Sequence, residues 1–89
     1  MPIALTAARL LARAAGISAR ARVLAELVSD RPLKDECSAI ELDALNVRTM
    51  LANTLRGSVD TPALLIDVER RLHENGARLE AIEHARHES

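Results

Sequence analysis

Apolar residues return every three or four positions along the last third of the chain, and this spacing predicts a helix with one apolar face. Between about residues 62 and 87 they follow a seven-residue repeat. One flank of the repeat carries Glu69 and Glu83, whereas the other carries Arg71 and Arg78. Such a face needs a covering helix, from this chain or another. We take the inward positions as an interaction seam: Leu65, Val68, Leu72, Asn75, Leu79 and Ile82.

A second seven-residue repeat covers about residues 4–28. Small residues alternate in it with larger aliphatic ones, an arrangement that lets two helix backbones approach closely. Gly16 is a poor residue for a helix interior, so a break at residues 16–18 and one continuous helix are both open. The N-terminal packing face consists of Ala7, Leu10, Ala14, Ile17, Ala21 and Leu24.

The same segment resembles the turn of a helix-turn-helix DNA-binding unit. The run ARAAGIS at residues 12–18 has the small residue four positions before the glycine and the apolar residue after it that the motif requires. Arg22 stands where the motif has Val or Ile. The resemblance implies a DNA-binding segment at residues 12–28, with Arg20 and Arg22 as candidate nucleic-acid contacts.

The middle of the chain predicts a connection followed by a helix at about residues 39–56. Pro32 interrupts helical geometry, which indicates a loop over residues 29–37. Ser38 and Glu41 have the spacing of a capping box, in which each side chain bonds the other residue's amide. We therefore expect this helix to begin near Ala39 and to turn at residues 57–60.

The final helix has its own start signal and one weak point. Thr61 is a good N-cap, and Pro62 is favoured at the first helical position. Asn75-Gly76 is a common turn pair, but the repeat keeps its phase on both sides of it. We expect one continuous helix over about residues 62–87.

Composition supports an all-α fold. The 89 residues include sixteen Ala and fourteen Leu but no aromatic residue, so the core must be aliphatic. We predict a single domain, a small three- or four-helix module built on an antiparallel hairpin of residues 39–56 and 62–87. The apolar stripes exceed what one central helix can cover, which favours an oligomeric bundle.

Charge is divided unequally along the chain. Residues 1–34 carry a net charge of +4 and residues 35–89 a net charge of −5. A basic half can face nucleic acid, but it can also face the acidic half of its own chain or of a second copy. We favour a protein partner or self-association over nucleic acid.

Little in the sequence points to catalysis or to a cofactor. The only cysteine, Cys37, lies beside acids that raise a thiol pKa, and no nucleophile, phosphate-binding or redox motif is present. His73, His84 and His87 lack the arrangement of a metal site. We therefore predict no enzyme, no cofactor and no metal.

Location is only weakly indicated. The chain has no apolar run long enough to span a membrane, and its single cysteine fits the cytoplasm. Residues 1–25 have four Arg and no acid, like a mitochondrial transit peptide, although we prefer a basic amphipathic helix. Eleven Arg against one Lys suggest a GC-rich, bacterial genome.

Together these features predict a non-enzymatic module for protein–protein interaction, such as an adaptor, a chaperone-like protein or a regulatory subunit. It would act through helix–helix packing, most simply as a homodimer, with another chain bound beyond Leu79. The alternative is a small DNA-binding transcriptional regulator that uses residues 12–28.

Overall fold

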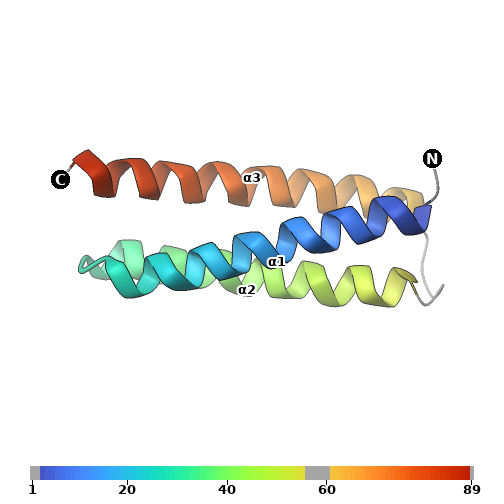
Figure 1. The fold of residues 1–89 in the computed structure, drawn as a ribbon, viewed down its shortest axis with the longest axis horizontal. Coiled ribbons are helices and arrows are strands. Elements are labelled where there is room, and N and C mark those ends of the chain that lie inside the picture. Colours follow the sequence, from blue (N-terminus) through green and yellow to red (C-terminus); the bar gives the residue numbers. More distant parts are fainter. Residues whose placement is uncertain (1–2, 56–60, 89) are drawn as a thin grey trace.

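The computed structural model describes residues 3–55 and 61–88, and these form three helices. Helix α1 spans Ile3–Leu27, α2 spans Arg31–Leu55 and α3 spans Thr61–Glu88. Helix α2 runs antiparallel to both neighbours, so α1 and α3 are parallel (Figure 1). The bundle measures 45 × 19 × 16 Å. The predicted all-α fold, with its helical-hairpin architecture, is confirmed.

Both questions about helix breaks have the same answer. Helix α1 continues through Gly16, and α3 continues through Gly76. In each case the apolar repeat keeps its phase across the glycine, so packing holds the helix together at a position of low intrinsic propensity.

The predicted start of α2 at Ala39 is wrong, because the helix begins at Arg31. The side chain of Asp30 accepts a hydrogen bond from the Leu33 amide at 3.3 Å, which makes Asp30 the N-cap. Pro32 then lies in the first turn, where the missing amide hydrogen leaves no bond unmade. The Ser38–Glu41 pair is in the helix interior.

The turn between α1 and α2 is only three residues long. The Lys34 ammonium donates to the Val28 carbonyl at 3.2 Å, which satisfies an open acceptor at the C-terminal end of α1. The tight turn holds α1 and α2 side by side. The predicted second turn, residues 57–60, and the predicted helix end at Arg56 lie outside the described residues.

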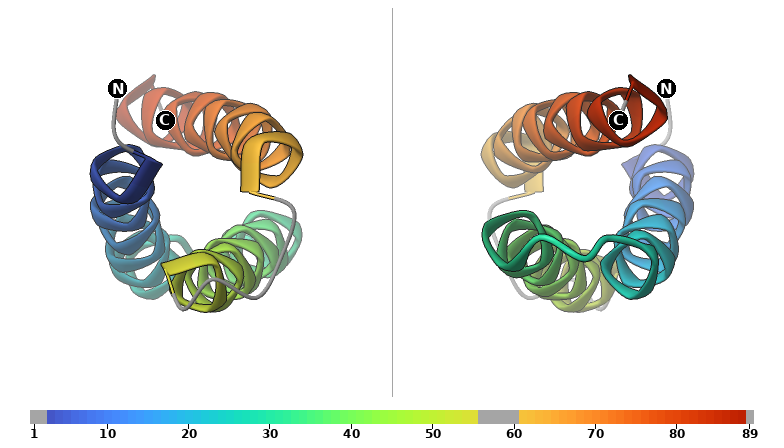
Figure 2. Two further views of the ribbon diagram at one scale, coloured as in Figure 1. Left: turned by 90° about the vertical axis from the view of Figure 1, so that its right-hand side faces the viewer. Right: turned by 90° about the vertical axis from the view of Figure 1, so that its left-hand side faces the viewer.

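Helix α1 packs more extensively on α2 than either helix packs on α3. The expected main hairpin, α2 with α3, is therefore the looser of the two hairpins. Ala7, Ala14 and Ala21 of α1 are fully buried, and such small residues permit two helix backbones to approach closely. The three helices lie at the corners of a triangle (Figure 2).

The core is aliphatic and lies along the bundle axis. From α2 it takes one narrow stripe, since Leu42 and Leu45 are 63% and 38% exposed. No described helix combines the length and the sustained apolar character that a membrane crossing requires. The buried residues of α2 are Cys37, Ile40, Ala44, Val47 and Leu51.

Candidate interaction surface

The predicted seam on α3 is covered inside the chain. Leu65 is half-buried and packs against the core, and the other five seam residues are buried. Leu79 and Ile82 belong to this buried set, so the expectation that the seam beyond Leu79 is open for another chain is wrong. Helix α2 starts eight residues earlier than expected and therefore reaches this end of α3.

The N-terminal packing face is likewise closed. All six of its residues are buried, together with Val28. Each of the three helices covers part of the other two, so these apolar stripes do not require a second copy to cover them. Any surface for a partner must therefore lie on the outside of the bundle.

The two charged flanks of α3 face different helices. On the flank toward α1, Arg20 binds Glu83 at 2.5 Å. On the flank toward α2, Arg78 lies 3.3 Å from Glu36, and Arg71 pairs with Asp43. Of these three pairs, Arg20–Glu83 joins the basic residues 1–34 to the acidic residues 35–89, and the other two lie within residues 35–89. Because these pairs bridge different helices, they favour one arrangement of the three helices around the axis.

Asn75 is the buried polar centre of the α2–α3 contact. Its amide nitrogen donates to Asp43, and its amide oxygen accepts from Arg78 at 3.3 Å. Partial burial raises the pKa of Asp43, but hydrogen bonds from Asn75 and Arg71 and the charges of Arg71 and Arg78 outweigh it, so this pKa lies below its ordinary value. Asn75 is buried rather than solvated, since its exposed fraction is 3%.

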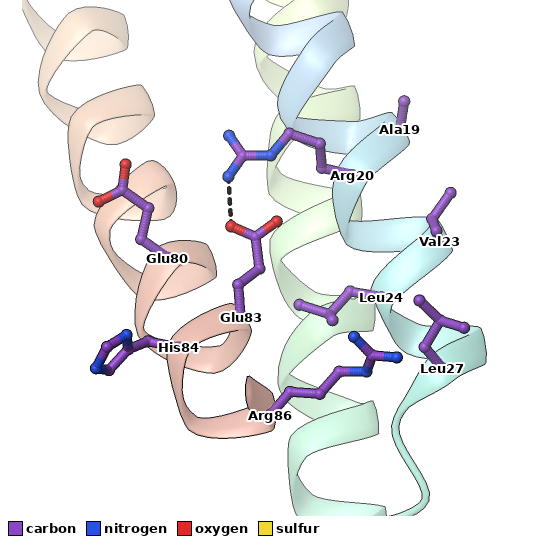
Figure 3. Close-up of a pocket in the computed structure, with 9 residues that line it drawn as sticks. All are labelled: Ala19, Arg20, Val23, Leu24, Leu27, Glu80, Glu83, His84 and Arg86. Atoms are coloured by element: carbon purple, nitrogen blue, oxygen red, sulfur yellow. Dashed lines mark hydrogen bonds and ion pairs between the residues drawn. The ribbon is translucent and has the colours of Figure 1, made fainter. Parts of the chain in front are cut away.

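An open groove runs between the C-terminal halves of α1 and α3, with a volume of about 700 Å³ (Figure 3). The Arg20–Glu83 pair crosses it, and Leu24 contributes to its apolar wall. Val23 and Leu27 on α1 are 56% and 53% exposed. The lining residues are Ala19, Arg20, Val23, Leu24, Leu27, Glu80, Glu83, His84 and Arg86.

A second hollow of about 380 Å³ adjoins this groove nearer the middle of the bundle. Gly16 of α1 and Gly76 of α3 both line it, as do Arg13 and His73. Arg20 and Glu80 line both hollows, so the two lie side by side. We call the two hollows together the α1/α3 groove.

A row of small and aliphatic residues runs along the outer side of helix α1, beside its exposed arginines. Its outermost positions are exposed and carry small or aliphatic residues, although a solvent-facing helix surface is normally polar. Leu5 at its N-terminal end is 51% exposed. These outward positions include Leu5, Ala8, Ala12, Ala19 and Val23.

The candidate nucleic-acid contacts lie on an uninterrupted helix. Because α1 has no turn at residues 12–18, the predicted helix-turn-helix geometry is wrong. Arg20 is bound to Glu83, and Arg22 is exposed on α1.

The remaining candidate groups show no catalytic arrangement. Cys37 lies on α2, in the core of the bundle rather than in a loop. Burial is the main cause of its raised thiol pKa, and the charge of Glu36 raises that pKa further. Among residues 3–55 and 61–88, no three His, Cys, Asp or Glu side chains are grouped as a metal ion requires. His73 and His84 are exposed, and the side chain of His87 is outside the described set.

The fold and surface define a three-helix bundle that closes its core within one chain and leaves an apolar groove on one side. Comparisons with protein-family models, with curated proteins and with solved structures find no match.

Proposed function

We propose that this chain is a non-enzymatic helical interaction module, an adaptor, chaperone-like or regulatory subunit, that binds a protein partner on the outside of α1 and α3. The observation that supports it most directly is the apolar outer side of α1. Exposed apolar patches commonly mark interaction sites, and this one lies beside exposed arginines such as Arg9 and Arg22. Val23 and Leu27 would each gain roughly 1 kcal/mol from burying their exposed halves.

The α1/α3 groove offers a place for such burial. It lies between two parallel helices, and a fourth helix in it would complete a four-helix arrangement. The internal seams are covered and Asn75 is hydrogen-bonded, so the bundle needs no partner to satisfy its core. Binding would therefore add to a folded module. The buried Cys37 thiol and its raised pKa favour a non-catalytic role.

The DNA-binding alternative has less support. Its turn is absent, and one of its two candidate contacts is engaged by Glu83. Binding to non-specific DNA that weakens steeply with salt would support it.

A cytoplasmic location is part of the proposed function of an interaction module, and the free thiol of Cys37 supports that location.

Site-specific photo-crosslinking in the native host tests the proposal. A photoreactive residue replaces Ala19 in the groove or, as a control, Leu42 on the outer side of α2. Crosslinks to protein are expected from position 19 and not from position 42. They should disappear when Val23→Asp and Leu27→Asp are added, whereas Leu42→Asp with Leu45→Asp should leave them unchanged. Equal crosslinking from both positions, or none from position 19, would contradict the proposal.

A further inference from the structure

Residues about 60 positions apart lie at the same level on the parallel helices α1 and α3. Gly16 and Gly76 line one hollow, which fixes the offset, and the Arg20–Glu83 pair agrees with it to within a helical turn. At this offset, exposed residues of α1 pair in height with exposed residues of α3. Leu5 is level with Ile66, Arg9 with Glu69, and Arg20 with Glu80.

This side of the bundle, the α1/α3 face, carries opposite charges on its two helices. Arg9 and Arg13 on α1 and Glu69 and Glu80 on α3 are exposed, and none bonds to another residue in the described part of the chain. α1 has no acid before Glu26. Apart from Arg86 near the C-terminal end of α3, the face is therefore basic along α1 and acidic along α3.

Exposed apolar side chains stand at the N-terminal end of the same face. Leu5 is 51% exposed and Ile66 is 72% exposed, the largest value among the exposed large apolar residues of the described chain. At the opposite end, Val23 and Leu27 supply the apolar surface. Charged residues occupy the stretch between them.

The two glycines lie at the centre of this face. A methyl group added at Gly16 or Gly76 would meet no atom within 4 Å, so packing inside the chain does not require glycine at either position. Each glycine nevertheless weakens its helix relative to alanine. A side chain that enters the hollow from outside would explain why both positions are kept free of side chains.

Symmetry decides which partner this pattern fits. A two-fold axis parallel to the helices lays α1 of one copy on α3 of the other at the same level. Basic residues then meet acidic ones, and Leu5 meets Ile66 of the partner subunit. An axis perpendicular to the helices instead lays α1 on α1 and opposes like charges.

We propose that the α1/α3 face binds the same face of a second copy in this parallel arrangement, with Arg9 opposite Glu69 of the partner subunit. The inference rests on the proposed function and names its partner. The whole bundle measures 45 Å by 19 Å along its two longer axes, and a stable interface buries about 800 Å² per partner. The whole face must therefore take part.

Disulfide trapping tests the arrangement. Ala12→Cys on α1 and His73→Cys on α3 lie at the same level, and native Cys37 is fully buried. Mixed and mildly oxidised, the two variants should give a covalent dimer containing one of each. Each variant oxidised alone should give little covalent dimer. Equal crosslinking of Ala12→Cys with itself would place α1 on α1 and overturn the proposal.

A charge exchange gives an independent readout. Arg9→Glu and Glu69→Arg should each raise the dimer Kd roughly tenfold, since each change affects two symmetric pairs. The combined variant should regain most of the affinity. A chain that is monomeric at micromolar concentrations overturns the second copy as partner. If that monomer still crosslinks another protein through position 19, the proposed function stands without it.

Discussion

Replacing Gly16 and Gly76 by alanine should stabilise each chain and weaken its association. Both glycines are inside helices, and the added methyl group meets no atom within 4 Å. Alanine is favoured over glycine in a helix interior by about 0.8–1.0 kcal/mol, so the double variant should gain about 2 kcal/mol in free energy of unfolding. For a chain of this size, that raises Tm by about 8–16 °C.

The assay is urea unfolding followed by circular dichroism, at protein concentrations low enough to keep the chain monomeric. Ala12→Gly, at an exposed position of α1, is the matched control and should lose about 1 kcal/mol. A loss of stability in Gly16→Ala or Gly76→Ala would show that the hollow is occupied within the chain.

The same double variant carries a second expectation. If a partner side chain enters the hollow, the two methyl groups reduce its space, and the dimer Kd rises while the monomer becomes more stable. A double variant that is more stable but has the same dimer Kd as the unaltered chain would show that the interface does not use the space at Gly16 and Gly76.

Three further predictions concern the fold. Asp30→Ala should cost about 1 kcal/mol in urea unfolding through loss of the α2 N-cap, and an unchanged free energy of unfolding would contradict the cap. Ala14→Leu should cost about 1–3 kcal/mol in thermal unfolding, because its site is fully buried and a larger side chain would overpack it; unchanged stability would mean that the packing there is loose. Asn75→Ala should raise the pKa of Asp43 in an NMR titration. Because the pKa of Asp43 is lowered in the folded state, ionised Asp43 stabilises the fold above about pH 4, and this stabilisation is lost as the pH falls through the folded-state pKa. The variant should lose the stabilisation at a higher pH than the unaltered chain. An unchanged titration of Asp43 would contradict the Asn75 contact.

The seven-residue repeats in the sequence predicted most of the fold. They identify the buried residues of α1 and α3, because the spacing of apolar residues marks the buried face of a helix whichever neighbour covers that face. The flanking charges of α3 were also readable, and the structure shows them facing two different helices. Which neighbour covers which stripe was not readable, because it depends on turn length and interhelical distance.

The errors in α2 have a local cause. Asp30-Arg31-Pro32 can end a helix or cap a new one, and the same residues support both readings. Choosing the first reading shortened α2, placed Cys37 in a loop and left the far end of α3 uncovered. The α1/α3 face was missed because its alanines looked like ordinary helix formers until the core side of α1 was known.

Sedimentation equilibrium on three proteins tests the central claim, that the outside of α1 and α3 is a binding surface. The unaltered chain should sediment at about twice its 9.7 kDa mass. Val23→Asp with Leu27→Asp should sediment as a monomer with unchanged helicity, and Leu42→Asp with Leu45→Asp should stay dimeric. A dimer that survives Val23→Asp with Leu27→Asp, or that is lost equally in both double variants, would show that the outside of α1 and α3 is not the binding surface.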